Sequence, residues 1–370
     1  MFQLLEEASR SNAIDLALGI PGAPVTSPAL IDAAGQALRG GRNQYEVLAG
    51  NPELRRWIAD TLPAPTDPES ELTITVGATE ALGVAVLSLI DPGDEVVIFE
   101  PYYENFVNTV VLAGGVPRFV RTHPPTWRYD PAQLRSAFNP ATRAIIVSTP
   151  NNPTGHMLGA TEWAEIAELC ERWNVVAVSD EIYGGYTFTE RHISVVEVPA
   201  LRERSMLVGS LSKSHAVSGW RLGYLRAAAH LTAAARQVHA TLCGGAAAPL
   251  QAAVAAAAAL DPAVAGPTDD LRAQRDRVLS LFNAAGFRCL APDGGCYVMA
   301  GIPDPADEDS DSLARRLVRQ AGILVAPGSL FYADTAAGSH HVRVAFNRTM
   351  GFLDEAGKRL AAFHDPPRDP

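Results

Sequence analysis

The chain has 370 residues, of which 47% are hydrophobic and 19% charged, and its formal net charge is −11. A chain of this length exceeds one ordinary core, so we expect two domains. The acidic balance argues against nucleic acid as a partner, because a phosphate-binding surface needs a basic field, and no apolar run is long enough to span a bilayer. From about Leu72 to Leu225, apolar runs alternate with helical patterns, which predicts a mostly parallel sheet wrapped by helices. Ligands bind at the carboxyl ends of the strands in such sheets.

The first candidate site segment is Thr73-Ile-Thr-Val-Gly77-Ala78-Thr79, where a strand passes through glycine into a helical pattern. Backbone amides at the start of a helix bind phosphate, because the unpaired N–H groups and the helix dipole act together. Gly77, Ala78 and Thr79 are therefore candidate phosphate ligands, although such a turn alone is a weak signal.

The second segment, residues 144–155, is an apolar strand that ends in Asn-Pro and Thr-Gly turn signals. Asn152 is expected at the mouth of this strand, where its amide can donate a hydrogen bond to a ligand. The third segment, residues 175–183, is an apolar, β-branched run that stops at Asp180 and predicts a buried strand.

A buried carboxylate is costly unless it is paired, and a protonated pyridine nitrogen is a partner that would keep Asp180 ionised. Tyr183, three residues further on, is placed to hydrogen-bond the phenolic oxygen of the same cofactor. The alternative for Asp180 is a helix N-cap or a salt bridge in a loop.

The fourth segment places Lys213 between small hydroxyl residues, Ser210 and Ser212, with Arg221 following. Lysine can form a Schiff base with the aldehyde of pyridoxal 5'-phosphate (PLP), while the serines and the planar, bidentate guanidinium take the phosphate. Alone, this segment is equally compatible with a solvated lysine on a surface loop. The three preceding segments favour the cofactor.

These segments, in this order, resemble the fold-type I PLP enzymes, specifically the class I/II aminotransferases of the branch that includes kynurenine, glutamine and methionine transaminases. The resemblance covers nearly the whole chain. It also includes Asn43-Gln-Tyr45, Gly50-Asn-Pro-Glu-Leu-Arg55, Glu100-Pro101-Tyr-Tyr103, Ala326-Pro-Gly328-Ser and Val342-Arg343-Val-Ala-Phe346.

The resemblance implies that Lys213 is the Schiff-base lysine and proton shuttle, that Asp180 pairs the pyridine nitrogen, and that Tyr103 stacks on the ring. Asn152 and Tyr183 would hold the phenolic oxygen. The phosphate ligands would be Gly77, Ala78, Thr79, Ser210, Ser212, Arg221 and Tyr45 of a neighbouring subunit.

For the substrate, the resemblance implies that Arg343 clamps the α-carboxylate, helped by Asn152 and by backbone near Gly19. On periodicity alone Arg343 is an exposed strand residue, because it lies in an alternating stretch. The contribution of Tyr45 implies a homodimer with shared active sites.

The implied fold is α/β. A large PLP-binding domain with a mostly parallel, seven-stranded-type sheet spans residues 41–266, and residues 1–40 and 267–370 form a smaller α+β domain. Four scattered cysteines fit a reducing compartment better than a disulfide framework, and the acidic N-terminus lacks the order of a secretion signal, so we expect a cytoplasmic protein.

We therefore expect a PLP-dependent aminotransferase that moves the amino group of a neutral or aromatic L-amino acid to a 2-oxo acid by ping-pong transamination. The segment from Gly244 to Pro249 has only small, uncharged residues. No arginine lies between Arg236 and Arg272 to bind a distal carboxylate. The alternative is a lyase, cyclase or oxidase-type enzyme on the same fold, because the cofactor supplies the carbanion and the pocket decides its fate. A regulator is disfavoured, because the enzyme pattern begins by about Leu18 and leaves no room for an N-terminal DNA-binding module. A catalytically dead binding protein is disfavoured, because the lysine and the aspartate are both present.

Overall fold

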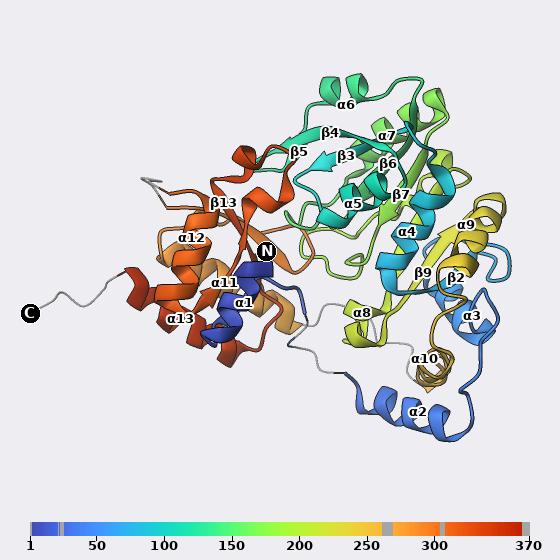
Figure 1. The fold of residues 1–370 in the computed structure, drawn as a ribbon, viewed down its shortest axis with the longest axis horizontal. Helices are drawn as coiled ribbons and strands as arrows, with labels where there is room; N and C mark the ends of the chain where they lie inside the picture. Colours follow the sequence, from blue (N-terminus) through green and yellow to red (C-terminus); the bar gives the residue numbers. More distant parts are fainter. Residues whose placement is uncertain (1, 21, 23–25, 261–268, 304–307, 365–370) are drawn as a thin grey trace, which may run out of the picture.

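The computed structural model describes residues 2–20, 22, 26–260, 269–303 and 308–364. It consists of a larger part around one eight-stranded sheet and a smaller part with two short sheets at the opposite end of the molecule (Figure 1). The strands of the large sheet, in spatial order, are β2 (Leu72–Val76), β9 (Leu222–Ala227), β8 (Ser205–Ser210), β7 (Val176–Asp180), β6 (Thr142–Ser148), β3 (Glu95–Glu100), β4 (Val116–His123) and β5 (Arg128–Tyr129).

Strands β8, β7, β6, β3 and β4 are mutually parallel, and β9 is antiparallel to both β8 and β2. The prediction of a mostly parallel α/β sheet is confirmed. The eighth strand, β5, is a two-residue antiparallel addition to β4, outside the seven expected strands. Because the parallel strands and β2 run the same way, the residues that follow them gather along one edge of the sheet.

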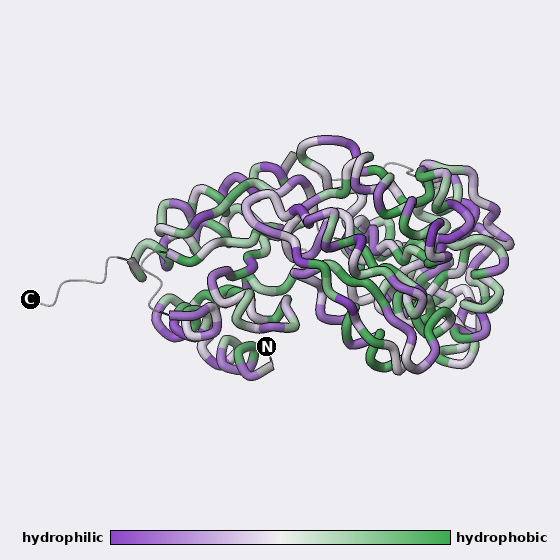
Figure 2. The backbone as a smooth tube through the Cα atoms, turned by 90° about the horizontal axis from the view of Figure 1, so that it is seen from above, coloured by the Kyte–Doolittle hydropathy of each residue, from purple (hydrophilic) through white to green (hydrophobic). Residues whose placement is uncertain are grey.

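Helices cover both faces of this sheet, so its central strands are apolar on both sides. In β3, Val96 and Ile98 pack with helices α4 and α5, whereas Val97 and Phe99 pack on the opposite face with α7. Figure 2 shows the hydrophobic strands in the interior of this part. Its helices are α3 (Pro52–Thr61), α4 (Gly77–Leu89), α5 (Glu104–Leu112), α6 (Pro131–Ala137), α7 (Ala160–Trp173), α8 (Leu211–Ser214), α9 (Ala229–Leu242) and α10 (Ala248–Leu260).

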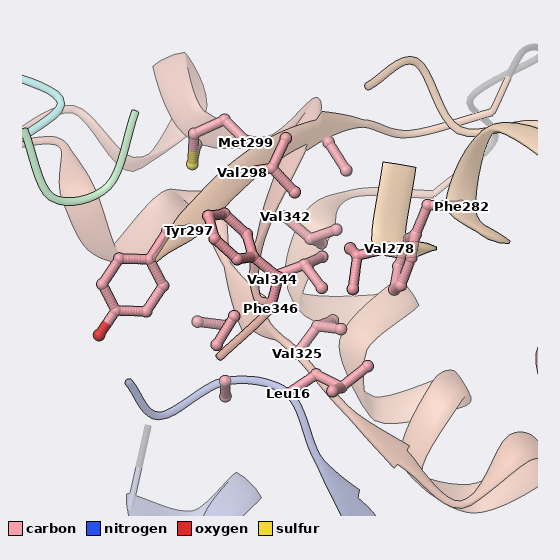
Figure 3. Close-up of a cluster of buried hydrophobic side chains, with 14 of the residues drawn as sticks. Leu16, Val278, Phe282, Tyr297, Val298, Met299, Val325, Val342, Val344 and Phe346 are labelled. Atoms are coloured by element: carbon pink, nitrogen blue, oxygen red, sulfur yellow. The ribbon is translucent and has the colours of Figure 1, made fainter. Parts of the chain in front are cut away.

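The smaller part contains the three-stranded sheet β10 (Tyr297–Gly301), β13 (His341–Ala345) and β12 (Ala326–Pro327). The first strand of the chain, β1 (Ile14–Asp15), pairs in parallel with β11 (Ile323–Leu324), so the N-terminal segment lies in this part. Figure 3 shows Leu16 in the same apolar cluster as Val342, Val344 and Phe346. The helices of the smaller part are α1 (Phe2–Arg10), α11 (Asp269–Ala284), α12 (Ser310–Arg316) and α13 (Met350–His364).

Helix α2 (Pro28–Arg39) lies between the two parts along the chain and packs mainly against α10. The short helical turns are η1 (Val195–Glu197), η2 (Pro199–Leu201), η3 (Ser218–Trp220), η4 (Leu317–Ala321), η5 (Gly328–Phe331) and η6 (Thr335–Gly338). Within the described ranges, no helix is long and apolar enough to cross a membrane.

Candidate active site

The expected site residues converge at the carboxyl edge of the large sheet. Asp180 is the last residue of β7, Asn152 follows β6, and Lys213 lies in the single-turn helix α8 directly after β8. Asp180 is in register with Ser148 on one side and Val208 on the other, so these strands end at the same level. The structure therefore brings together side chains that are up to 61 residues apart in the sequence, from Asn152 to Lys213.

Lys213 points its amine into the interior, toward the N-terminal segment. Its Nζ donates a hydrogen bond to the carbonyl oxygen of Gly19 at 2.7 Å, and burial lowers the pKa of this amine below its ordinary value. The hydroxyl of Tyr186 donates to the Lys213 carbonyl at 2.6 Å and so holds the α8 turn. A less basic amine is a better nucleophile and proton acceptor near neutral pH.

Asp180 is 7% exposed and receives a hydrogen bond of 3.2 Å from the backbone N–H of Ile182. Burial raises the pKa of its carboxyl to about 7, and Lys213 opposes that rise. Its carboxylate forms no salt bridge with any residue in the described part of the chain. A protonated pyridine nitrogen is the kind of cation that would stabilise this carboxylate.

Three elements form a candidate phosphate site, which we call the phosphate cradle: the N-terminus of α4, the backbone at Gly223 and the guanidinium of Arg221. At Gly77 and Gly223 there is no room for a side chain. A Cβ at Gly77, whose φ is +73°, would lie 2.6 Å from Nη2 of Arg221, and a Cβ at Gly223 would lie 2.5 Å from the amide nitrogen of Ala78. The guanidinium of Arg221 is exposed and lies 3.5 Å from the Thr79 hydroxyl. A helix N-terminus beside an accessible arginine binds phosphate, so this donor set and Asp180 together fit PLP.

Arg343 is buried, at 7% exposure, because β13 is the central strand of its sheet and pairs with β10 and β12. The prediction from periodicity alone, an exposed strand residue, is therefore wrong. Its Nη1 donates to Oδ1 of Asn152 at 2.8 Å and its Nη2 to the Ala17 carbonyl at 2.6 Å. Among the described residues, the buried Nε has no hydrogen-bond acceptor.

Two aromatic rings hold the Arg343 guanidinium in place, that of Tyr297 at 4.1 Å and that of Phe331 at 4.8 Å from the ring centres. Figure 3 shows the Tyr297 hydroxyl pointing away from the apolar cluster. The guanidinium is thus a fixed, planar cation, which is the donor geometry that suits a carboxylate.

The three tyrosines predicted to bind the cofactor, Tyr45, Tyr103 and Tyr183, differ in their burial within one chain. Tyr103 is half-buried, and burial together with the charge of Asp180 raises the pKa of its hydroxyl to about 12. Tyr183 is buried, with its hydroxyl 3.5 Å from that of Tyr297. Tyr45 is 92% exposed, so within one chain it stays outside the site.

Sequence reasoning missed Arg348, Tyr186 and Tyr297. Arg348 is buried and binds the N-terminal segment: its Nε donates to the carbonyl of Asp15 at 3.0 Å, its Nη1 to that of Ile20 at 2.6 Å, and its Nη2 to that of Leu18. The spacing of Tyr183 and Tyr186 places both on one turn and was an available signal. The role of Arg348 had no local signal, because the three carbonyls that it binds in the N-terminal segment are more than 300 residues away.

The fold and this site define a PLP-dependent enzyme. The chain belongs to the family "Aminotransferase class I and II", whose sequence profile matches residues 11–360. The expectations of the family, of PLP as cofactor and of an aminotransferase are confirmed.

Relatives are similar over almost their full length. The chain is 35% identical to the probable N-succinyldiaminopimelate aminotransferase DapC of Mycobacterium tuberculosis, over 97% of this chain and 94% of the relative. A solved structure of the M. tuberculosis N-succinyldiaminopimelate aminotransferase matches with a TM-score of 0.92 and covers 98% of this chain and 96% of that one. The methionine aminotransferase of Escherichia coli is 29% identical over 97% of this chain and 94% of the relative. None of these three is named as a lyase.

Proposed function

We propose that this aminotransferase transfers the amino group of a neutral or aromatic L-amino acid to a 2-oxo acid, with Lys213, Asp180 and Arg343 in the central roles. When bound, PLP supplies the electron sink that makes the α-proton of the amino acid acidic, and it carries the amino group between the two substrates. Lys213 holds the cofactor in the resting enzyme, and its Nζ moves the α-proton. Asp180 holds the proton on the pyridine nitrogen.

The remaining residues position the cofactor and the substrate. The amides of Gly77, Ala78 and Thr79, with Ser210, Ser212 and Arg221, bind the phosphate, while Tyr103 stacks on the ring and Tyr183 and Asn152 face the phenolic oxygen. Arg343 binds the substrate carboxylate through its free Nε edge, supported by Asn152 and by backbone near Gly19. Holding substrate and lysine in fixed geometry is itself a large part of the rate acceleration.

The preference for an uncharged side chain rests on the hydrogen bonds of Arg348. This guanidinium donates to three backbone carbonyls of residues 15–20 and to the Oδ1 of Asn347 at 2.9 Å, so these acceptors occupy four of its five N–H groups. Arg221 belongs to the phosphate cradle and Arg343 to the α-carboxylate. A distal carboxylate would therefore lack an arginine partner in the described part of this site, and burying it unpaired is costly.

We include in the proposal a homodimer with shared active sites, located in the cytoplasm. Large apolar side chains are exposed on α2, on the loop that follows it and at the end of α9: Ile31, Leu38, Tyr45, Val47, Leu48 and Leu242. Such a concentration is typical of an interface. In the proposed domain division, residues 41–266 form the large domain and residues 1–40 and 267–370 the small one, although α2 packs on α10 of the large domain.

The experiment is a half-reaction screen of the purified holoenzyme, following the absorbance of bound PLP with single amino-acid donors. The panel contains methionine, kynurenine, phenylalanine, aspartate and, because of the name of the DapC relative, N-succinyldiaminopimelate. We expect methionine and the aromatic donors to convert the cofactor to its pyridoxamine form and to leave a 2-oxo acid with an intact side chain. Ammonia release without that conversion would reject transamination. Exclusive use of aspartate or N-succinyldiaminopimelate would reject the neutral pocket.

A further inference from the structure

Three potential metal ligands of different chemistry meet outside the proposed active site. They are Glu80 of α4, His239 near the end of α9 and Cys243, which caps that helix. The carboxylate Oε1 lies 2.7 Å from Nδ1 of the imidazole and 3.0 Å from the sulfur, and the sulfur lies 3.5 Å from Nδ1. The three donor atoms therefore form one compact triangle.

The contacts of His239 leave Nδ1 as the ring nitrogen that can bind a metal ion. The side chain is fully buried, and its Nε2 lies 3.2 Å from the backbone carbonyl of Leu48. A neutral imidazole has one N–H, and a hydrogen bond from Nε2 to that carbonyl leaves a lone pair on Nδ1. That lone pair faces the Glu80 carboxylate at 2.7 Å, so a proton or a metal cation must lie between them. A histidine oriented through its second nitrogen in this way is the usual arrangement in metal sites.

The triangle is close to the size that a tetrahedral divalent cation requires. With metal–ligand distances of about 2.0–2.3 Å to nitrogen, oxygen and sulfur, tetrahedral angles separate the ligands by roughly 3.3–3.7 Å. The observed separations are shorter by at most about 0.6 Å. Glu80, whose Oε2 accepts a hydrogen bond from the Val76 N–H, must therefore shift slightly to admit the ion. Cys243 is exposed, which opens a path for entry and a position for water as the fourth ligand.

One backbone donor also faces the sulfur. The backbone N–H of Gly245 donates to Sγ of Cys243 at 3.4 Å, and Gly244 and Gly245 both have positive φ, of +68° and +123°, which lets the chain turn back over the sulfur. Outer-sphere donors of this kind orient and tune the ligands of a metal site.

We propose that Glu80, His239 and Cys243 bind a borderline or soft divalent cation, with Zn²⁺ as the representative ion. Thiolate and imidazole select such ions, whereas Mg²⁺ and Ca²⁺ prefer all-oxygen sites. Binding releases the thiol proton, and any proton held between Glu80 and His239, to the solvent. The ion joins α4, one residue beyond Thr79, to the end of α9 and, through Leu48, to the loop that carries Tyr45.

The test is a titration of the holoenzyme with Cd²⁺, which reports a cadmium–thiolate bond by an ultraviolet charge-transfer band, followed by competition with Zn²⁺. We expect one equivalent of Cd²⁺ to produce the band, Zn²⁺ to remove it, and Mg²⁺ at the same concentration to leave it unchanged. The band should disappear in Cys243→Ala, and Glu80→Gln should weaken binding about tenfold or more. The matched control is Cys289→Ala, which removes a buried thiol elsewhere and should keep the band.

Cys243 is exposed, so its replacement should leave the fold intact, and circular dichroism checks this. Zn²⁺ should also raise the unfolding temperature of the wild type and of Cys289→Ala but not of Cys243→Ala, because a ligand of the native state stabilises it. Absence of the band in the wild type, or a band of equal strength in Cys243→Ala, would overturn the site. Neither result depends on transaminase activity, so failure here is distinguishable from failure of the proposed function.

Discussion

The charge of Asp180 depends on what lies next to it, because burial raises the pKa of this carboxyl to about 7 and a single backbone N–H stabilises it within the described chain. Asp180→Asn keeps the size of the side chain but removes its ability to hold a proton on the pyridine nitrogen. We expect bound PLP to be retained and turnover to fall by orders of magnitude, since the electron sink is lost. Single-turnover kinetics with saturating amino acid measure the loss.

Cofactor content, measured from the absorbance of the desalted variant, is the control for this substitution. Turnover close to wild type with full occupancy would show that the ring works unprotonated. Loss of the cofactor itself would assign Asp180 to retention of PLP and not to the chemistry.

At single residues, the sequence was most predictive where a residue ends an apolar run. Asp180 ends β7 and Lys213 follows β8, and their positions after apolar runs predicted that they lie at one edge of the sheet. Arg343 and Arg348 were beyond such reasoning, because their burial depends on partners from the other end of the chain: Ala17 for the first, and Asp15 and Ile20 for the second.

At the level of elements, His156 holds the loop between β6 and α7 in place through two ion pairs. Its Nε2 lies 3.0 Å from Glu162, which also caps the start of α7 through the N–H of Gly159, and its Nδ1 lies 3.4 Å from Asp293 in the smaller part. Burial by itself lowers the pKa of His156, but the two carboxylates outweigh burial and raise the pKa to about 9.

A raised histidine pKa means that the folded state holds the proton more tightly than the unfolded chain. The stabilisation by His156 is therefore complete below pH 6.5, the ordinary histidine value, and is lost as the pH rises through about 9. It amounts to at most about 3 kcal/mol. We expect the difference in free energy of unfolding between wild type and His156→Gln to be largest at pH 6 and to shrink toward pH 9.5.

Urea unfolding of both proteins across this range, at saturating PLP, measures that difference. His230→Gln is the matched control, because His230 is exposed on α9 and its replacement should give no such trend. A constant difference between wild type and His156→Gln at all pH values would contradict the ionic role of the histidine.

Long elements with a regular hydrophobic pattern could be predicted from the sequence. Short elements, and elements that form only by pairing with distant residues, could not. Helix α11 is a charged helix of 16 residues, whereas β5 has two residues and exists only through its pairing with β4. The pattern of helix α2 shows that it is amphipathic but not which partner it covers.

For the whole molecule, the proposed dimer makes Tyr45 the most informative residue, because it is 92% exposed in one chain. If it donates a hydrogen bond to the phosphate in the neighbouring subunit, Tyr45→Phe should weaken PLP retention by on the order of 1–2 kcal/mol without unfolding the protein. The dissociation constant for PLP, with light scattering for the oligomeric state, measures this. Leu112→Ala, a change at a 76% exposed side chain on α5 outside the proposed interface, should keep wild-type retention. A fully active monomer would contradict the shared site.

The architecture of the large sheet followed from alternating apolar runs, because a buried parallel strand needs hydrophobic residues on both faces. The return of the N-terminal segment to the smaller part could be inferred only through the family resemblance. Residues Ile14 and Ile323, which pair in that return, are 309 positions apart, and no local pattern encodes such a contact.

Arg348 anchors residues 15–20 through their main chain, which decides which positions of this segment can be substituted. Its contacts are to main-chain oxygens of Asp15, Leu18 and Ile20, which every amino acid presents alike, so the anchoring is indifferent to the side chains at those positions. Leu18 and Ile20 flank Gly19, whose carbonyl meets Lys213, and Ile20 is 54% exposed. Substitutions of Leu18 and Ile20 should therefore leave this segment anchored and the Gly19 carbonyl in place at Lys213, so two positions beside the catalytic lysine are open to change.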